Sequence, residues 1–304
     1  MIYFLIFYNS LNIENTKVQN FYNNLFSYIK QNNSLLNQYK IDNNIDLLGM
    51  YDIINDSEKF NNNLLLKKDS KIFLITIGGD GTLFNSLSLI KKSLIIKKIK
   101  SYLNIFVFPI NFGSKGFYCF YDKNYINNIE NFINKILIDY NNSIYLKGFF
   151  MKLTIKDIEE YFIGDIVIKS KINHKPVKLR YYINDSDIYL EELSDGLLVF
   201  SKFGTTGYFL SLNGTFIDLD IDDLIGITFI APHSIKYKPQ IFKDKKIYIE
   251  NLDNNELVII KDGQVLNNLI FSPKETVEIN LDNSFFYLMG KTNIFDKWYN
   301  TFYI

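Results

Sequence analysis

Asp80 is the side chain best placed to do chemistry, because glycines surround it in the segment Gly78-Gly79-Asp80-Gly81-Thr82. Glycine adopts conformations that other residues avoid and lets a ligand approach the main chain closely. The free amides of such a loop, and the positive end of a following helix with Thr82 as its N-cap, favour a bound anion. The segment predicts a phosphate-binding loop that carries one carboxylate. A strand-to-helix turn with a solvated aspartate is the alternative for this segment taken alone.

A second glycine loop follows another apolar run, in Asn111-Phe112-Gly113-Ser114-Lys115-Gly116-Phe117-Tyr118. Loops after neighbouring parallel strands line the same edge of a sheet, so the second loop strengthens the prediction. Asn111 can bind an amide or a hydroxyl, and Phe117 or Tyr118 offers a ring on which a base could stack. An ordinary turn with core aromatics explains Tyr118 equally well.

A third segment, Asp195 to Tyr208 and on to Ser211, enters a short apolar strand through Asp-Gly and leaves it through Gly-Thr-Thr-Gly-Tyr. It gathers a carboxylate, two hydroxyls and an aromatic ring, which are groups that ribose and adenine need. The alternative is a hairpin whose glycines serve turns.

The elements that must position these residues fall into two kinds. Up to about residue 140, strand-like runs alternate with helical periodicity, which predicts a parallel sheet with helices on its faces. The strands are expected at Ile2–Tyr8, Ile72–Ile77 and Ile105–Ile110, and the helices at Val18–Ile29, Leu83–Ile96 and Tyr125–Ile138.

From about Ser143 onwards the helical pattern gives way to short runs of β-branched and aromatic residues, which predict an all-β domain. The expected strands are Phe150–Ile155, Tyr161–Ile168, Leu179–Ile183, Gly196–Ser201, Gly226–Ile230, Lys246–Glu250, Leu257–Lys261 and Thr276–Leu281.

We therefore predict an α/β domain over residues 1–142, an all-β domain over 143–284, and a tail over 285–304 that packs back on the first domain. The tail has helical or mixed spacing, with Phe295, Trp298, Tyr299 and Phe302. Because ligands bind beyond the carboxyl ends of parallel strands and between domains, the glycine loop is expected to open toward the β domain.

Composition limits the possible functions. The 304 residues include 33 basic and 33 acidic side chains, so no global field attracts nucleic acid or an acidic membrane. One cysteine and two histidines exclude an internal disulfide and a Cys/His zinc cluster. Met1 to Tyr8 lacks a basic start and is interpreted as a strand rather than a signal peptide. With no apolar run of membrane-spanning length, we expect a soluble cytoplasmic protein.

Three motifs in this order resemble one family, the NAD kinases. Gly78 to Gly81 resembles the family's Gly-Gly-Asp-Gly loop, and Asn111 to Phe117 resembles its Asn-x-Gly-x-x-Gly-Phe segment. Asp195 to Tyr208 resembles its Asp-Gly strand with a Gly-Ser/Thr-Thr-Ala-Tyr turn, and Ile183-Asn184-Asp185 is similar as well. The glycine loop alone is shared with diacylglycerol-kinase-like and phosphofructokinase-like enzymes, whereas the later motifs are not.

The resemblance implies that the protein transfers a phosphoryl group from ATP to the 2′-hydroxyl of the adenosine ribose of NAD, giving NADP. It implies Mg²⁺ or another divalent cation as cofactor and Asp80 as the acceptor of the hydroxyl proton, a role that suits a carboxylate. Because the chain has no Walker lysine, the glycine loop must hold the phosphates. A homodimer or homotetramer is also implied.

Site residues carry over by the same resemblance. Gly81 and Phe117 are expected to contact nucleotide, beside Gly78, Gly79, Thr82, Asn111 and Tyr118 of the same loops. The NAD pocket is expected to contain Asp195, Thr206, Gly207, Tyr208 and Ser211, with Tyr208 against adenine. Gln264 matches a late binding position, and His174 and Lys175 lie where some relatives have a basic contact to phosphate. A surface loop explains His174 equally well.

One departure bears on the acceptor. Where relatives have Asn-Glu, this sequence has Gly164-Asp165, so the amide that would bind adenine is missing. Lys202-Phe203 replaces the usual Pro-Thr, and Gly207 stands where alanine is usual. Two other hypotheses therefore stay open: a dinucleotide-binding protein that has lost turnover, and a kinase of another acceptor. The choices between ATP and polyphosphate, and between NAD and NADH, also stay open.

Overall fold

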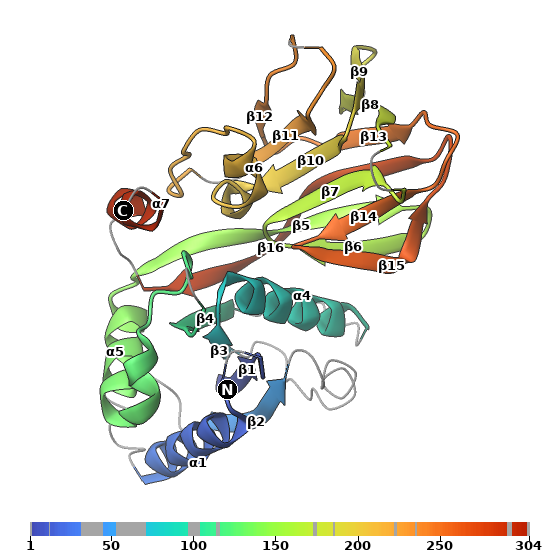
Figure 1. The fold of residues 1–304 in the computed structure, drawn as a ribbon. Coiled ribbons are helices and arrows are strands. Elements are labelled where there is room, and N and C mark those ends of the chain that lie inside the picture. The colour runs from blue at the N-terminus through green and yellow to red at the C-terminus, as the bar shows by residue number, and fades with distance from the viewer. Residues whose placement is uncertain are drawn as a thin grey trace. The chain divides into compact units, whose positions relative to one another are not determined.

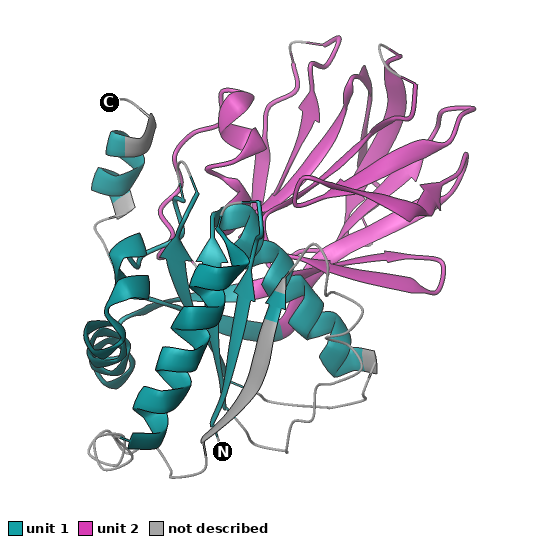
Figure 2. Cartoon of the chain, turned by 60° about the horizontal axis from the view of Figure 1, so that its bottom comes forward, with its two compact units in different colours: residues 1–148, 284–304 teal, residues 149–283 magenta. Residues whose placement is uncertain are grey.

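The computed structural model describes residues 2–11, 13–31, 45–52, 71–96, 104–113, 116–172, 175–184, 186–221, 224–234, 236–290 and 294–302 (Figure 1). The chain divides into two compact units (Figure 2). Unit 1 comprises residues 1–148 and 284–304, and unit 2 comprises residues 149–283. The chain passes between the units in two strands, β5 (Tyr145–Ile155) and β16 (Thr276–Met289).

Unit 1 contains a parallel sheet in the order β2-β1-β3-β4-β16. Its other strands are β1 (Ile2–Tyr8), β2 (Ile45–Asp52), β3 (Lys71–Gly78) and β4 (Asn104–Asn111). Every residue of β1, and all of β3 after Lys71, is buried. These strands are continuous apolar runs because helices cover both faces of the sheet.

Helices α1 (Asn15–Gln31) and α5 (Ile129–Asn141) share one apolar core with alternate residues of β1, β3 and β4. Helix α4 (Asp80–Ile96) contacts β1 and β3 and lies on the opposite side of the sheet from α1 (Figure 1). Unit 1 also contains the 3₁₀ helix η1 (Lys123–Asn127) and helix α7 (Ile294–Phe302).

Unit 2 is built on antiparallel strands. One sheet has the order β12-β11-β10-β7-β14-β15, and a second contains β16-β13-β8-β9 with β5 paired to β16 and β6. Apolar side chains from both sheets form one core between them, as in a β-sandwich. The bounds not yet given are β6 (Ile158–Phe162), β7 (Asp165–Ser170), β8 (Val177–Ile183), β9 (Tyr189–Ser194), β10 (Gly196–Ser201), β11 (Leu224–Ile230), β12 (Gln240–Lys243), β13 (Ile247–Asn251), β14 (Leu257–Lys261) and β15 (Gln264–Phe271).

The outer face of the six-stranded sheet is covered by one short helix and its neighbouring loop. Helix α6 (Tyr208–Ser211) follows the 3₁₀ turn η2 (Lys202–Gly204), and Phe209 stacks on Phe200 of β10 with ring centroids 4.1 Å apart. Ile217, from the loop after α6, belongs to the same apolar cluster. The turn after β10 is therefore fixed by packing.

The predicted fold class is confirmed: a parallel α/β unit is combined with an antiparallel β unit. Several predicted bounds were wrong. The run Tyr161–Ile168 is two strands, β6 and β7, separated by Ile163 and Gly164. Residues before Ile129 form a 3₁₀ turn because Asn128 caps α5 by accepting a hydrogen bond from the Asn131 amide. No helix in the described ranges has the length and apolar character needed to cross a bilayer.

Candidate functional site

The first glycine loop joins β3 to α4 with no intervening residues except Gly79. The helix begins at Asp80, and the amides of Thr82 and Leu83 donate to the Gly79 carbonyl at 3.0 and 3.2 Å. Gly79 thus takes the capping position predicted for Thr82, and that prediction was wrong. Thr82 lies within the first turn and is buried, with its hydroxyl where a Cβ on Gly78 would be 2.2 Å away. A small residue at Gly78 is therefore a packing requirement.

The two glycine loops lie side by side. Gly78 pairs with Asn111 across β3 and β4, and the Phe112 amide donates to the Gly78 carbonyl at 2.8 Å. Gly113 lies so close to Gly79 that a Cβ on Gly113 would be 2.9 Å from the Gly79 Cα. Backbone therefore packs against backbone, which only glycine permits.

Asp80 connects the two loops through its side chain. One carboxylate oxygen, Oδ2, accepts a hydrogen bond from the Phe117 amide, and Oδ1 accepts one from the Tyr118 amide, each at 2.8 Å. The Cys119 thiol lies 3.7 Å from both Asp80 Oδ1 and the Gly78 carbonyl oxygen. The carboxylate is thus held at the start of α4 by the far end of the second loop.

The electrostatics of Asp80 reflect opposing effects. Burial raises the pKa of the carboxyl, while the Tyr118 and Phe117 amides and the charge of Lys297 lower it, leaving a pKa above the ordinary value. Lys297 comes from α7, and its ammonium donates to the Cys119 carbonyl at 2.9 Å. Burial lowers the pKa of Lys297, although Asp80 opposes that shift. Sequence reasoning missed Lys297 because its proximity to Asp80 depends on the return of the C-terminal segment.

Phe117 and Tyr118, at the end of the second loop, are buried. The rings of Phe117 and Tyr118 are 2% and 1% exposed and contact each other with centroids 4.9 Å apart. A base could stack on either ring only after the loop moves. The Asn111 side-chain oxygen accepts the Gly113 amide at 3.0 Å, so it shapes the loop. Ser114 and Lys115 lie outside the described residues.

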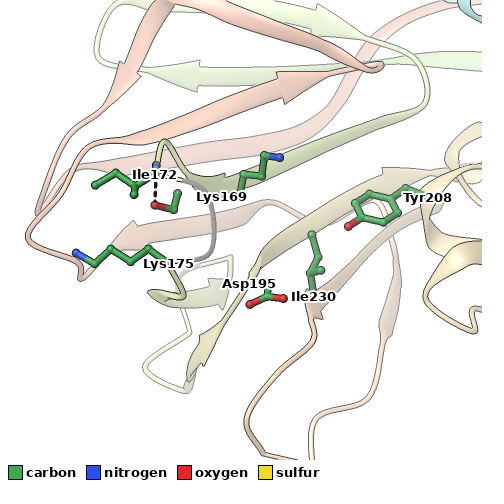
Figure 3. Close-up of a pocket in the computed structure, with 7 residues that line it drawn as sticks. Lys169, Ile172, Lys175, Asp195, Tyr208 and Ile230 are labelled. Atoms are coloured by element: carbon green, nitrogen blue, oxygen red, sulfur yellow. Dashed lines mark hydrogen bonds between the residues drawn. The ribbon is translucent and has the colours of Figure 1, made fainter.

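Unit 2 contains a pocket of about 250 Å³ (Figure 3) that includes three predicted residues, Lys175, Asp195 and Tyr208. Asp195 and Tyr208 are exposed, and Lys175 lies 3.9 Å from Asp253. The whole lining consists of Lys169, Ser170, Ile172, Lys175, Asp195, Tyr208 and Ile230. Thr206, Gly207 and Ser211, which were predicted for the same pocket, lie in the turn and helix beside Tyr208 but outside this lining. His174 lies outside the described residues.

The Gly164-Asp165 segment lies beside this pocket. The Asp165 carboxylate accepts a hydrogen bond from the Tyr208 amide, and a Cβ on Gly207 would be 3.4 Å from that carboxylate. Burial, followed by the charge of Asp262, raises the pKa of Asp165 to about 7. Gly164 is buried, and a Cβ on Gly204 would lie 2.5 Å from its carbonyl oxygen. Gln264, predicted from a late motif, is exposed at the start of β15.

Two residues near this segment were not predicted as part of the site. Asp262 accepts hydrogen bonds from the backbone on both sides of Gly164, and its Asp-Gly turn was the only local signal. Lys202, noted as a departure from the family, is 3% exposed and donates to the Leu219 carbonyl at 2.9 Å. Lys202 therefore ties the loop after α6 to the turn after β10.

Comparisons with known proteins match this arrangement to one family. The family model described as the ATP-NAD kinase C-terminal domain matches residues 163–284. The NAD kinase of Borreliella burgdorferi is 31% identical over 181 residues, which is 58% of this chain and 60% of that protein. The NAD kinase of Buchnera aphidicola is 30% identical over 240 residues, covering 75% of this chain and 72% of that protein. This chain belongs to the NAD kinase family.

Solved structures agree on the fold. The NAD kinase of Archaeoglobus fulgidus in complex with ATP has a TM-score of 0.64 at 16% identity, covering 99% of this chain and 98% of that one. Yeast NADH kinase complexed with NADH has a TM-score of 0.69 at 17% identity, covering 99% and 86%. The chain spans less than two thirds of the first Borrelia-group NAD kinases it matches, 60% and 61% of their lengths.

Proposed function

We propose that this member of the NAD kinase family phosphorylates the 2′-hydroxyl of the adenosine ribose of NAD with ATP, giving NADP. The observation that carries the proposal is the Asp80 carboxylate, held by the Phe117 and Tyr118 amides where two glycine loops meet. A glycine-lined strand end beside a helix start suits a triphosphate. A single oriented carboxylate suits a hydroxyl that must lose its proton.

Asp80 is proposed as the proton acceptor. Oδ1 accepts the Tyr118 amide and lies 3.7 Å from the Cys119 thiol, whereas Oδ2 accepts only the Phe117 amide. Since each carboxylate oxygen has about two acceptor positions, Oδ2 retains one for the substrate hydroxyl. The amides fix the carboxylate and lower its pKa, but burial raises that pKa by more. The raised pKa brings that basicity closer to neutral pH, which favours general-base catalysis.

A divalent cation fits this site as a companion of the nucleotide. Among the described residues, no three His, Cys, Asp or Glu side chains are grouped so as to hold a metal ion. Mg²⁺ commonly uses one or two carboxylates together with substrate phosphates and water. We therefore propose that Mg²⁺ would be held mainly by the ATP phosphates and would neutralise their charge there, while Asp80 is the carboxylate that this loop supplies. The chain's own contribution is the loop amides and Asp80.

The pocket of unit 2 is proposed to bind the dinucleotide. Tyr208 is exposed at its edge and offers a ring face to adenine, while Asp195 can accept hydrogen bonds from ribose hydroxyls and Lys175 can contact phosphate. Asp165, which accepts the Tyr208 amide, takes the place of the family's glutamate. Thr206, Gly207, Ser211 and Gln264 are proposed to complete the binding surface.

A coupled assay of NADP formation tests the proposal directly. Purified protein is incubated with NAD, ATP and Mg²⁺, and NADP is measured through an NADP-specific dehydrogenase. We expect turnover that is lost in Asp80→Asn and retained in Asp122→Asn, because asparagine can replace Asp122 as the cap of η1. Wild-type protein with no activity above the Asp80→Asn background would overturn the proposal.

A dinucleotide-binding protein without turnover is the second candidate, favoured by Gly164, which has no side-chain amide for adenine. Calorimetry separates it from the kinase. NAD binding with no NADP formation would support the second candidate alone. Phosphoryl transfer to another alcohol, inhibited by NAD, would support a kinase of another acceptor.

Assembly and location follow by analogy with the family. We propose a homodimer or homotetramer that is located in the cytoplasm, with neither nucleic acid nor a membrane as partner. Light scattering of the purified protein would measure its mass in solution, and a monomer would contradict the proposed assembly.

A further inference from the structure

A tight turn of unit 2 directs a carboxylate onto the Gly164 segment. Asp262 and Gly263 form the two-residue turn between β14 and β15, with φ values of 46° and 79°. Positive φ at both positions is typical of a type I′ hairpin, in which Asp-Gly is a preferred pair. The turn residue Asp262 is half-buried, unlike its exposed neighbours Gly263 and Gln264.

The Asp262 carboxylate accepts three successive backbone amides. Its Oδ2 accepts from Ile163 at 3.0 Å, and its Oδ1 accepts from Gly164 at 2.7 Å and from Asp165 at 3.1 Å. In return, the Asp262 amide donates to the Asp165 carbonyl at 2.9 Å. Hydrogen bonds to an ionised acceptor are stronger than neutral ones. The break between β6 and β7 is therefore held open by one side chain from a distant hairpin.

The segment that Asp262 holds is connected to the proposed dinucleotide pocket through Tyr208. The Asp165 side chain accepts the Tyr208 amide, and Tyr208 lines the pocket. Gly164 also accepts the Ser201 amide at 2.9 Å, which ties the same segment to the end of β10. A displacement of the segment would thus move the residue that carries the adenine-facing ring.

We propose that Asp262 is a positioning residue that fixes the Gly164-Asp165 segment and, through Asp165, the placement of Tyr208 for dinucleotide binding. The inference rests on the proposed function, because it assigns a role within the proposed NAD pocket. Asp262 acts through Asp165 and its neighbours. This role explains how a chain without the family's asparagine at position 164 keeps this edge of the pocket in place. The Asp262 carboxylate, rather than a side chain at position 164, fixes the backbone there.

A second consequence of this role concerns the pKa of Asp165, which a purely structural role of Asp262 would leave unchanged. The charge of Asp262 contributes to the raised pKa of Asp165. The Ile163, Gly164 and Asp165 amides and Lys261 lower the pKa of Asp262, against a larger increase from burial. Lys261 in turn pairs with Glu160 at 2.9 Å. Removing the charge of Asp262 must therefore lower the pKa of Asp165.

The test compares Asp262→Asn with Asp157→Asn, an exposed aspartate in the β5–β6 turn of the same unit. For Asp262→Asn we expect KM for NAD to rise about tenfold while KM for ATP stays within twofold, because one charge-assisted acceptor is lost. We also expect the ionisation near pH 7 in kcat/KM for NAD to move to lower pH. Asp157→Asn should match wild type in both.

The outcomes separate this inference from the proposed function. A folded Asp262→Asn with KM for NAD within twofold of wild type, or with an unmoved ionisation, overturns the positioning role. If that variant does not fold, Asp262→Glu keeps the charge but displaces the carboxylate by one methylene, and a KM for NAD unchanged from wild type overturns the role. If the wild type has no turnover, the proposed function fails, and calorimetric NAD affinity of the same variants replaces KM.

Discussion

Gly79 and Gly113 approach each other so closely that a methyl group on Gly113 would lie 2.9 Å from the Gly79 Cα. This contact joins the two loops that surround Asp80, and it depends on the absence of side chains. Gly81 differs, because a Cβ there would have no neighbour within 4 Å. Packing between the loops thus requires glycine at position 113 but not at position 81, and substitution can tell the two apart.

Gly113→Ala is expected to lower the free energy of unfolding by about 1–3 kcal/mol, because the overpacked contact must separate the two loops. Gly81→Ala should leave stability unchanged or slightly raised, since the site is open and alanine favours the first turn of α4. Urea denaturation of both variants measures this difference. Equal losses of stability would contradict the packing described for the two loops.

Asp80→Asn should lower kcat about 10²–10⁴-fold, since an amide cannot accept the hydroxyl proton. It should also cost about 1–2 kcal/mol of stability, because one of the two amide donors, Phe117 or Tyr118, loses its acceptor. Steady-state kinetics and thermal denaturation measure the two effects. A variant that retains more than a tenth of wild-type kcat would exclude Asp80 as the proton acceptor.

Lys297→Gln should shift the acidic limb of the pH–rate profile to higher pH. The charge of Lys297 lowers the pKa of Asp80, so its removal raises that pKa further above the ordinary value. Because the basic form of Asp80 exists only above its pKa, activity must fall first at the acidic end. Lys123→Gln, at an exposed position of η1, is the control. A profile that coincides with wild type would mean that Lys297 does not act on Asp80.

Asp165→Asn should make the protein more stable than wild type at neutral pH but not at acidic pH. The folded pKa of Asp165 is about 7, raised above the ordinary value of 3.8, so the folded state keeps a proton that the unfolded state releases between these values. Wild-type stability therefore falls as pH rises through this window, by up to about 4 kcal/mol relative to the variant. Asparagine can still accept the Tyr208 amide.

Denaturation curves at pH 4, 5.5 and 7.5 measure the effect, with Asp157→Asn as an exposed control. The gap between Asp165→Asn and wild type should widen with pH, whereas the control should stay parallel to wild type. A constant gap would show that Asp165 has an ordinary pKa in the folded protein.

The sequence alone determined that an α/β region is followed by an all-β region, because continuous apolar runs and runs of β-branched residues indicate which faces of the strands are buried. It also singled out the two glycine loops and the Asp195–Tyr208 segment, since glycine spacing is a local property. The predicted start of α4 was wrong because both Thr82 and Gly79 could serve as the N-cap residue. The packing of Thr82 against Gly78 places Thr82 inside the first turn and leaves the N-cap position to Gly79.

Tertiary structure alone decided which distant groups act on the proposed site residues. Lys297 reaches the Cys119 carbonyl beside Asp80 because the C-terminal segment rejoins unit 1, and Asp262 holds Gly164 because a hairpin tip meets the break between β6 and β7. The sequence indicates the Asp262-Gly263 turn but not the partners of Asp262 or of Lys297, since hydrogen bonds and charges act through space between residues that the fold brings together. The glycines beside Asp80 in the sequence thus identified it as a candidate site residue. Its electrostatic environment is set by residues far from it in the sequence.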